Sequence, residues 1–538
     1  MRIYPLEMRT MGRILAEKAS RVGDRPWLLW EDKIYTYGAL DEMTSRYANG
    51  FFAQGIRKGD HVALMLGNRP EFFWASWGLG KLGAVSVPIN TAAKGELLRY
   101  FIDQSDSTWV IVDEECAGRV VALTGQIPKV KRLVYAGQAA ASDSELRESK
   151  IPLTDLLEIG SASSATPSLD AVCHSDVNLI AYTSGTTGPS KGAVSPHSQG
   201  HGVGYSVSTH FGYRPDDVLY TCLPLFHGNA MWYTCYAALW ADATIALVPR
   251  FSASQFWDDV DRFGVTQFNS LGAMTNIIWK HPGPTKQHRL RQCMTVPSPK
   301  EIYFDFQSRY HLCITSVYAL TETCVVTLFT PTDPIEKAGS SGKAPGYVEI
   351  QIVDGDNRPL PPGESGEICI RSLEPGLMMH GYYKMPEATA QQMHGNWFHS
   401  GDRGYLDADG YLFFVDRKKE AIRRRGENIS AYEVELIISK HPQVLEAAAI
   451  PISSEMSEDD VMAYIVLKPG ESVSFEEIIT FCNHNMSYYM VPRFIEFVDS
   501  LPKTPSQKIE KYKLKQLAES RRSEIWDRDK SGIKLTRD

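Results

Sequence analysis

The stretch from Tyr182 to Gly192 gathers side chains that suit a phosphate group, in the order Tyr-Thr-Ser-Gly-Thr-Thr-Gly-Pro-Ser-Lys-Gly. Glycine lets the backbone take positive φ and come close to a ligand. Backbone N–H groups, hydroxyl donors and the cation of Lys191 are the groups that a polyphosphate needs. The apolar run at 177–181 predicts a strand that leads into this loop. The alternative is a flexible Gly/Ser/Thr linker, which Lys191 and the preceding strand disfavour.

The spacing of this loop separates it from two common nucleotide motifs. The Walker loop requires Gly-Lys-Ser/Thr after four free positions, and the dinucleotide fingerprint requires Gly-x-Gly-x-x-Gly. Neither pattern occurs between Tyr182 and Gly192. The sequence therefore indicates phosphate binding by another kind of loop.

A second group of functional side chains lies in Ser316–Thr323, after the strand-like run at 312–315. The face of Tyr318 is suited to stack on a purine ring, as aromatic side chains do with bases. The carboxylate of Glu322, next to the hydroxyl of Thr321, is suited to hold Mg²⁺, a hard cation that bridges to phosphates. This segment therefore predicts contacts with both ends of a nucleotide.

Asp402 is a third candidate, because it lies beside glycine in the sequence Trp-Phe-His-Ser-Gly-Asp-Arg-Gly-Tyr at 397–405. A fixed carboxylate beside glycine is suited to accept both hydroxyl groups of a ribose, as an acidic residue does in Rossmann folds. The alternative is a turn aspartate that is hydrogen-bonded to its own backbone. The length of the flanking motif favours the ribose interpretation.

These segments resemble the motifs of the adenylate-forming superfamily, which includes acyl-CoA synthetases, peptide-synthetase adenylation domains and luciferases. The segment Tyr182–Gly192 resembles its phosphate loop, and Ser316–Thr323 resembles its Gly-Tyr-Gly-x-Thr-Glu motif. The similarity extends over nearly the whole chain. In character it resembles the crotonobetaine/carnitine-CoA ligase branch of the bacterial acyl-CoA synthetases.

The resemblance implies a role for each matched residue. Tyr318 would stack on adenine, Thr321 would contact phosphate, and Glu322 would be the magnesium ligand. Asp402 would bind the ribose, Arg417 would contact the ribose or a phosphate, and Lys508 would be the catalytic lysine that bridges the α-phosphate and the substrate carboxylate. The phosphate loop would comprise Thr183, Ser184, Gly185, Thr186, Thr187 and Lys191.

Two further residues have open alternatives. His227 lies in the sequence Leu-Pro-Leu-Phe-His-Gly-Asn-Ala. It would either face the substrate carboxylate or act as a gate beside the acyl pocket. The alternative is a histidine at the start of a helix whose ring is hydrogen-bonded by the local backbone. Arg425 follows two other arginines in a run that reads most simply as a solvated basic turn. The resemblance instead implies a loop that closes over the pantetheine tunnel, where Arg425 would pair with a CoA phosphate.

The chain departs from the family pattern at several glycines. Val317 and Ala319 replace the two glycines around Tyr318, Arg425 replaces the first of a glycine pair, and Gln507 replaces the glycine before Lys508. Val317 and Ala319 make the backbone around Tyr318 stiffer. We therefore expect the fine shape of the adenine pocket to differ from the family norm.

The elements that position these residues follow a βαβ rhythm. A helix capped by Thr36, a strand at 61–66, a helix at 71–82 and a strand at 83–88 predict a mostly parallel sheet covered by helices. The resemblance implies a large N-terminal domain of αβαβα layers with a small β-subdomain, at residues 1–416. A small mobile α+β domain would follow at 417–538. Residues 137–170, rich in Ala, Ser and Glu, are expected to form a surface excursion.

Composition limits the protein class. A chain of 538 residues exceeds one typical core, so we expect at least two domains. The net charge of −8 argues against a general nucleic-acid binder. The nine cysteines include no Cys-x-x-Cys pair, which indicates reduced thiols. No membrane span, signal peptide or peroxisomal address is recognisable, so a cytoplasmic location is expected.

The expected function is ATP-dependent activation of a carboxylic acid and its transfer to CoA, with Mg²⁺ as the metal. One alternative is an adenylating enzyme that loads the acyl group onto a carrier protein, and another is a relative that only binds nucleotide. The likeness to carnitine-type ligases suggests a short polar acid such as a betaine. The sequence leaves open whether the chain forms a homo-oligomer.

Overall fold

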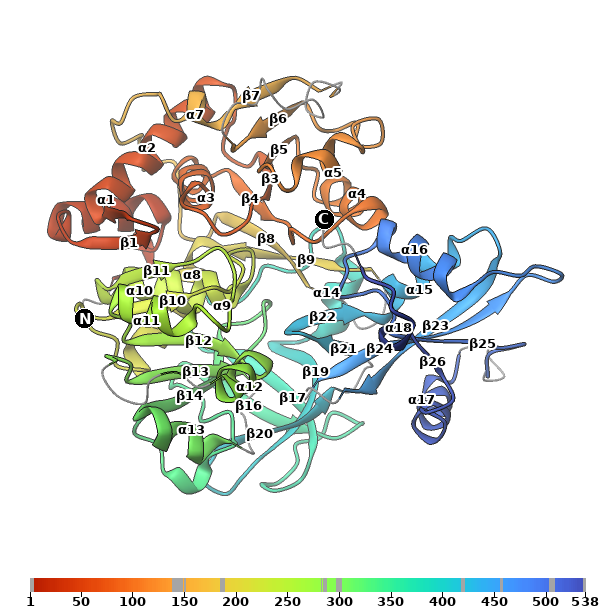
Figure 1. Cartoon of the computed structure of the whole chain (residues 1–538). Helices are drawn as coiled ribbons and strands as arrows, with labels where there is room; N and C mark the ends of the chain where they lie inside the picture. The colour runs from red at the N-terminus through yellow and green to blue at the C-terminus, as the bar shows by residue number, and fades with distance from the viewer. Residues whose placement is uncertain are drawn as a thin grey trace.

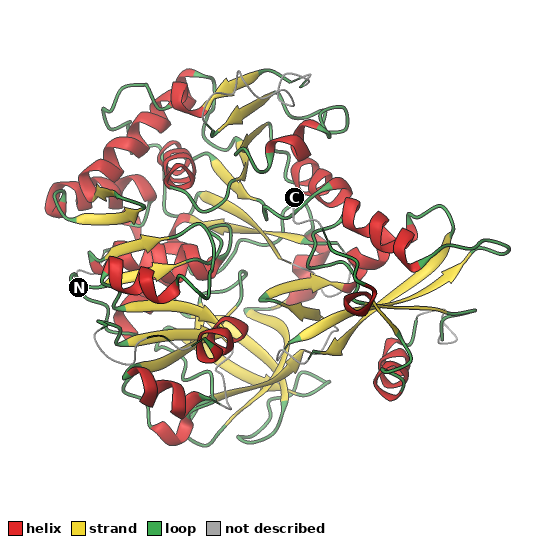
Figure 2. Ribbon diagram, in the orientation of Figure 1, coloured by secondary structure: helices red, strands yellow, loops and turns green. Residues whose placement is uncertain are grey.

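The chain folds into a large N-terminal part and a smaller C-terminal part that projects to one side (Figure 1). The computed structural model describes residues 4–137, 149, 151–183, 189–281, 283, 288–296, 302–417, 421–454, 458–502 and 509–535. Helices flank the sheets of both parts (Figure 2). None of the described helices is both long and apolar enough to cross a membrane.

The first sheet of the large part carries the phosphate-loop strands. Its strand order is β7-β6-β5-β3-β4-β8-β9, parallel throughout except for the final β8–β9 pair. The bounds are β3 (His61–Met65), β4 (Val85–Pro88), β5 (Trp109–Val112), β6 (Arg132–Tyr135), β7 (Leu153–Asp155), β8 (Val177–Thr183) and β9 (Lys191–Pro196). The crossovers include α3 (Pro70–Leu82), α4 (Gly95–Gln104) and α5 (Ala117–Val121).

The second sheet provides the strand that leads into the Tyr318 motif. Its order is β15-β14-β13-β12-β10-β11-β1-β2, with parallel pairs inside and an antiparallel pair at each edge. The bounds are β1 (Pro26–Trp30), β2 (Lys33–Thr36), β10 (Val218–Thr221), β11 (Thr244–Leu247), β12 (Gln267–Leu271), β13 (Gln292–Val296), β14 (Cys313–Ala319) and β15 (Val325–Phe329). The helices α11 (Phe256–Phe263), α12 (Gly272–Lys280) and α13 (Tyr303–Tyr310) accompany it.

A layer of helices lies between the two sheets and shares a core with both. Along β3, Val62 and Leu64 belong to the core cluster of this layer, whereas Ala63 and Met65 belong to the cluster on the opposite face. Both faces of the sheet are thus buried, as expected for parallel strands. The helix α8 contacts strands of both sheets. The layer and its neighbours include α1 (Met11–Val22), α2 (Tyr37–Ala53), α8 (His197–His210), α9 (Gly228–Ala230), a π-helical turn (Met231–Tyr236) and α10 (Ala237–Ala241).

A β-subdomain completes the large part, and a hairpin leads into the C-terminal part. The subdomain contains β16 (Val348–Val353), β17 (Gly366–Ser372), α14 (Pro386–Gln392), β18 (Met393–His394), β19 (Trp397–Leu406) and β20 (Leu412–Arg417). The hairpin pairs β21 (Ala421–Arg424) with β22 (Glu427–Ser430). The C-terminal part contains α15 (Ala431–Ser439), β23 (Val444–Ser453), β24 (Asp459–Leu467), α16 (Phe475–Asn485), β25 (Phe494–Phe497), α17 (Lys511–Ser520), β26 (Trp526–Asp527) and α18 (Arg528–Ser531).

Most local predictions agree with this architecture. Thr36 caps α2 because its side chain accepts a hydrogen bond from the backbone N–H of Ala39. The prediction of a surface excursion at 137–170 was wrong in part. Residues 153–155 form β7, which pairs in parallel with β6, and α7 (Leu156–Ile159) follows directly. This strand is too short to show a periodic pattern, and it forms because the edge of β6 is available.

Candidate active site

The phosphate loop is closed by a hairpin. Thr183 ends β8, Lys191 begins β9, and the two residues face each other across the antiparallel pair. The candidates Ser184, Gly185, Thr186 and Thr187 lie outside the described residues. The sequence predicted the first strand and did not predict the second. Pairing of the two strands holds the ends of the loop in place.

Glu322 lies beside this loop, as its predicted role requires. Its Oε1 accepts a hydrogen bond from the hydroxyl of Tyr382 at 2.8 Å and another from Thr183 Oγ1 at 3.3 Å. The side chain is 7% exposed. The Nζ atom of Lys191 lies 5.2 Å from the centre of the Tyr382 ring. The loop and the Ser316–Thr323 segment therefore meet around one carboxylate.

Tyr382 is a site residue that the sequence analysis missed. Backbone hydrogen bonds from Val194 N to Gly381 O and from Tyr383 N to Gly192 O fix its segment against β9. Burial raises the pKa of the Tyr382 phenol well above its ordinary value, and Glu322 adds to the shift. The phenol therefore stays neutral and donates to the carboxylate. The available signal was the Gly-Tyr-Tyr sequence at 381–383, which matches the family pattern.

The turn after β14 is braced from α8. The amide of Gln199, fully buried, donates to the backbone oxygens of Thr321 and Thr323, each at 3.0 Å.

Val317 lies within β14 and pairs with Leu328 of β15, so a β-branched residue suits its backbone. The backbone at Val317 is thus regular strand, and the register of β14 and β15 shifts only after Tyr318.

Tyr318 and Asp402 are in direct contact. The phenol of Tyr318 donates to Asp402 Oδ2 at 2.8 Å, and Asp402 is 2% exposed. Asp402 also faces Arg417 in the register of β19 and β20. The fold thus brings together the residues expected to contact adenine, ribose and phosphate. The carboxylate bonds a distant side chain, which the turn-aspartate alternative did not include.

His227 contacts the C-terminal hairpin. Its Nε2 lies 2.9 Å from Glu427 Oε2, although 200 residues separate the two. Burial lowers the pKa of His227, but the charge and hydrogen bond of Glu427 outweigh burial, so the net pKa is raised. The local-backbone alternative is therefore wrong for this ring nitrogen. Glu427 is a second residue that the sequence analysis did not single out.

The tip of the hairpin is a tight turn formed by Arg425 and Gly426, with φ values of 53° and 81°. A Cβ at Gly426 would lie 2.2 Å from Leu271 Cδ1, so the leucine side chain would have to shift, and the positive φ itself favours glycine. Arg425 is exposed in the left-handed conformation that most side chains avoid. The hairpin therefore approaches the carboxyl end of β12 with its basic residue at the surface.

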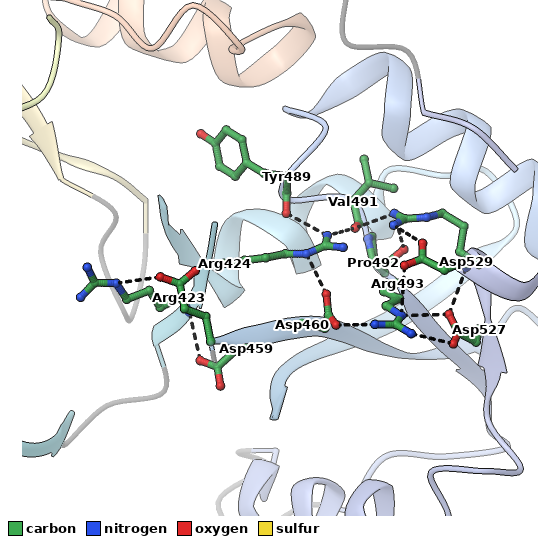
Figure 3. A network of polar contacts seen from close by, with 12 residues as sticks. Arg423, Arg424, Asp459, Asp460, Tyr489, Val491, Pro492, Arg493, Asp527 and Asp529 are labelled. Carbon is green, nitrogen blue, oxygen red and sulfur yellow. Dashed lines mark hydrogen bonds and ion pairs between the residues drawn. The ribbon is translucent and has the colours of Figure 1, made fainter. Parts of the chain in front are cut away.

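A network of ion pairs anchors the base of this hairpin to the C-terminal part (Figure 3). Arg424 Nε lies 2.9 Å from Asp460 Oδ1, and its Nη1 donates to the backbone oxygens of Tyr489 and Val491. Arg493 pairs with both Asp460 and Asp527. Burial lowers the pKa of Arg424 to about 10, and Asp460 opposes the shift. The hairpin is thus joined to the C-terminal part by buried ion pairs and hydrogen bonds.

The two parts also meet at the phosphate loop. Glu433 Oε1, from α15, accepts a hydrogen bond from the backbone N–H of Ser190 at 2.9 Å. Burial raises the pKa of Glu433 to about 7, while the bonds from Ser190 and the charge of Lys191 oppose the shift. Further contacts between the parts are Asn90 Nδ2 to Tyr489 Oη at 2.8 Å, Ser487 Oγ to Ala92 O at 2.8 Å and Lys440 Nζ to Glu96 Oε1 at 3.2 Å.

Lys508 is not placed, because it lies outside the described residues, as do the phosphate-loop candidates Ser184, Gly185, Thr186 and Thr187. Of Arg417, only the backbone is described. The other candidates fall into a nucleotide group around Glu322, Tyr318 and Asp402, and a second group where His227 meets the hairpin. Trp232 and Tyr236, which follow His227 in the sequence, are buried in the core.

Comparison with known proteins identifies similar chains. A crotonobetaine/carnitine–CoA ligase of Salmonella heidelberg is 34% identical over 523 residues, which is 92% of this chain and 96% of that protein. A double mutant of o-succinylbenzoate CoA synthetase from Bacillus subtilis, bound with its product analogue OSB-NCoA, is 26% identical with a TM-score of 0.79. The aligned region covers 94% of this chain and 98% of that one.

The same Bacillus subtilis synthetase in complex with AMP superposes less well, with a TM-score of 0.64 at 26% identity, covering 93% of this chain and 98% of that chain. The two structures of that synthetase therefore differ from each other, and this chain is more similar to the product-analogue complex. The sequence model of the AMP-binding enzyme family matches residues 15–383, and that of the AMP-binding enzyme C-terminal domain matches 433–508. The chain belongs to the AMP-binding enzyme family.

Proposed function

We propose that this protein is an AMP-forming carboxylic acid–CoA ligase. It activates a carboxylic acid with ATP to an acyl-adenylate and transfers the acyl group to CoA, giving acyl-CoA, AMP and pyrophosphate. The observation that carries the proposal is the convergence of Thr183, Lys191 and Glu322 beside the Tyr318–Asp402 pair. Relatives that are themselves named CoA ligases or synthetases support it.

The chemistry explains why these groups are needed. A carboxylate acylates poorly because its leaving group is oxide. Its attack on the α-phosphorus of ATP forms the mixed anhydride and breaks the bond to pyrophosphate. The CoA thiol then attacks the acyl carbon, gives up its proton and displaces AMP. The first step brings several negative charges together, so positioning and electrostatic stabilisation are the main requirements. Lys191 and Lys508 would supply cations.

Mg²⁺ fits the donor set around Glu322. The nearby side-chain atoms are the carboxylate and hydroxyl oxygens that this hard cation prefers. Within the described part of the chain, both hydrogen bonds to the Glu322 carboxylate go to Oε1. The other oxygen, Oε2, can therefore coordinate the metal ion. Glu322 would hold Mg²⁺, which would supply positive charge close to the phosphates. The side chains of Thr183 and Tyr382 hold the carboxylate in place.

The remaining candidates belong to a C-terminal domain that begins at residue 417 and extends to 538. Arg417 would contact the ribose or a phosphate, Lys508 would bridge the α-phosphate and the substrate carboxylate, and Arg425 would pair with a CoA phosphate.

We assign His227, in the N-terminal part, to the acyl side of the site. Its contact with Glu427 supports an arrangement suited to the CoA step, as does the higher TM-score against the product-analogue complex.

The proposed substrate is a short polar acid such as a betaine. The support is the 34% identity to a crotonobetaine/carnitine–CoA ligase over most of both chains. We propose a cytoplasmic location, supported by the finding that all nine cysteines are free thiols.

The decisive experiment is pyrophosphate release from ATP and Mg²⁺ across a panel of carboxylic acids, each with and without CoA. We expect pyrophosphate release with one class of acid. CoA should raise the rate of that release, and a thioester should form. Release that needs an added carrier protein would favour the carrier-loading alternative, and absence of release with every acid would contradict the proposal. Lys508→Ala should slow the first half-reaction and leave thioester formation from preformed adenylate largely intact.

A further inference from the structure

A surface hollow of about 390 Å³ lies in the C-terminal part, away from the candidate active site. The start of β25, the end of α17 and the segment through β26 and α18 form its walls. All the residues that line it lie between 493 and 530, so neither the large part nor the hairpin contributes to it. The helix α17 packs on β23 and lies on the outer side of the C-terminal part (Figure 1).

The ring of Phe494 supports two guanidinium groups in this hollow. The guanidinium carbon of Arg493 lies 4.8 Å from the centre of the ring, and that of Arg522 lies 5.5 Å from it. The ring itself is 3% exposed and belongs to a core cluster with Leu514 and Ala518. The two cations are therefore held near each other on a fixed support.

The charge of Arg493 is balanced by carboxylates of the ion-pair network (Figure 3). Its Nε and Nη2 atoms donate to Asp527 at 3.0 and 3.1 Å, and its Nη1 donates to Asp460 at 2.9 Å. Asp527, which also lines the hollow, is 6% exposed. The charges of Arg493 and Asp527 therefore largely offset each other, and their contacts make the wall of the hollow rigid.

Two further cations of the hollow have no such balance. Within the part of the chain that the structure describes, neither Arg522 nor Lys530 forms an ion pair or a side-chain hydrogen bond. The carboxylate of Glu519 also lines the hollow and opposes them. Two cations against one carboxylate leave an excess of positive charge, and the hydroxyl of Ser523 adds a hydrogen-bond donor. A guanidinium, an ammonium and a hydroxyl form a donor set that suits phosphate oxygens.

The size of the hollow limits the ligand. Sites for small molecules usually enclose roughly 300–1,000 Å³, and this hollow lies at the lower end of that range. It therefore has room for a phosphate group, either alone or with a short organic substituent.

We propose that this hollow binds a phosphate dianion, free or carried by a small organic molecule, with Arg522 and Lys530 as the binding cations. The site is separate from the phosphate loop, and the inference does not depend on the proposed ligase function. Glu519 weakens binding because its carboxylate repels the ligand.

The test measures how fast phenylglyoxal modifies Arg522 in the full chain at about pH 8, where a phosphate monoester is a dianion. Inorganic phosphate and glycerol 3-phosphate are the two probes, added at constant ionic strength so that screening does not change. Mass spectrometry of peptides gives the modification at each arginine. Bound phosphate should slow the modification of Arg522 in a saturable way. Stronger protection by glycerol 3-phosphate would identify a phosphate monoester as the ligand, and stronger protection by inorganic phosphate would identify the free ion.

Two variants change the binding charge in opposite directions. Lys530→Gln removes a cation and should raise the dissociation constant by up to about fivefold, as expected for an exposed charge pair. Glu519→Gln removes the opposing carboxylate and should lower the dissociation constant by a similar factor. A loosened fold would not bind more tightly, so the opposite signs separate charge from a structural effect.

Arg521 is the internal control, because it pairs with Glu496 and Glu524 and does not line the hollow. Neither probe should change its rate of modification. Lys513→Gln removes a cation that pairs with Glu510 on the same helix and should leave the dissociation constant unchanged. Equal protection of Arg521 and Arg522, absence of saturable protection, or an unchanged dissociation constant in Lys530→Gln and Glu519→Gln would overturn the inference. Each of these results would leave the ligase function intact.

Discussion

The phenol of Tyr318 donates a hydrogen bond to Oδ2 of Asp402 at 2.8 Å. The two residues are 84 positions apart in the sequence, and the bond joins β14 to β19. Tyr318 is the residue expected to stack on adenine, and Asp402 is the residue expected to bind ribose. The contact fixes the carboxylate, which is almost fully buried, with one donor that is independent of the ligand. The two residues proposed for adenine and ribose are therefore positioned relative to each other.

Tyr318→Phe should raise the KM for ATP by about tenfold, because Asp402 loses a donor that holds its carboxylate in place. The aromatic face remains, so stacking is kept and kcat should change little. Steady-state kinetics with varied ATP measures both values. Tyr411→Phe is the control, since the Tyr411 phenol donates to Asp333 Oδ1 at the same 2.8 Å outside the site. An equal KM rise in both variants would contradict the positioning role of Tyr318.

Tyr382→Phe should weaken binding of ATP with Mg²⁺ by about tenfold, because Glu322 loses its 2.8 Å donor while the ring near Lys191 stays. Binding can be measured by calorimetry without acid or CoA, which separates it from turnover. Tyr383→Phe makes the same chemical change one residue later, where the phenol donates to Asp106 Oδ2 at 2.8 Å. That control should bind ATP normally. Normal binding by Tyr382→Phe would show that Thr183 alone positions Glu322.

Arg425→Gly separates backbone strain from a role in CoA binding. Relief of the left-handed conformation, about 1–2 kcal/mol, is partly offset by roughly 0.5–1 kcal/mol of lost chain entropy. The free energy of unfolding should therefore rise only slightly. The KM for CoA should rise severalfold if the guanidinium pairs with a CoA phosphate. His311→Gly, at a residue with φ of 49° that ends α13, provides the stability comparison. An unchanged KM for CoA would remove Arg425 from the CoA site.

Local signals in the sequence predicted much of the fold. The cap at Thr36 and the apolar run at 177–181 depend on neighbouring residues, and both elements formed as expected. The long family motifs also pointed to candidate residues that come into contact in the structure, although their roles stay a prediction. Thr183, Tyr318, Glu322 and Asp402 come from separate segments and still meet in the structure.

The contacts between the two parts could not be predicted in this way. Glu433 and Glu435 are two residues apart on one helix, and helical periodicity does not say which of them faces the other part. The direction is decided by how α15 packs in its own core. Tyr382 was equally hidden, since its role depends on pairing of its segment with β9. Long-range packing determines what these residues contact, and residue spacing in the sequence does not indicate that packing.

Two buried histidines on α8 should make the N-terminal part sensitive to acid. His197 and His201 are both fully buried, and neither ring nitrogen of His201 has a hydrogen-bond partner within the described residues. Burial lowers the pKa of His197 to about 4, with Asp176 opposing the shift, and lowers the pKa of His201 well below its ordinary value. The folded state therefore keeps both rings neutral at pH values where the unfolded chain binds protons.

The sign of the pH dependence follows from this difference. Between about pH 6.5 and pH 4 the unfolded state binds more protons, so the free energy of unfolding falls as the pH is lowered, by up to about 1.4 kcal/mol per pH unit for each histidine. Glu433 acts in the opposite direction, because its raised pKa favours proton uptake by the folded state between about pH 7 and its ordinary value. His201→Phe keeps an aromatic ring and should reduce the slope by about 1.4 kcal/mol per pH unit. Urea unfolding at several pH values measures the slope. Tyr205→Phe on the same helix is the control, because it leaves both histidines in place, so a similar change of slope in that variant would contradict the assignment to His201.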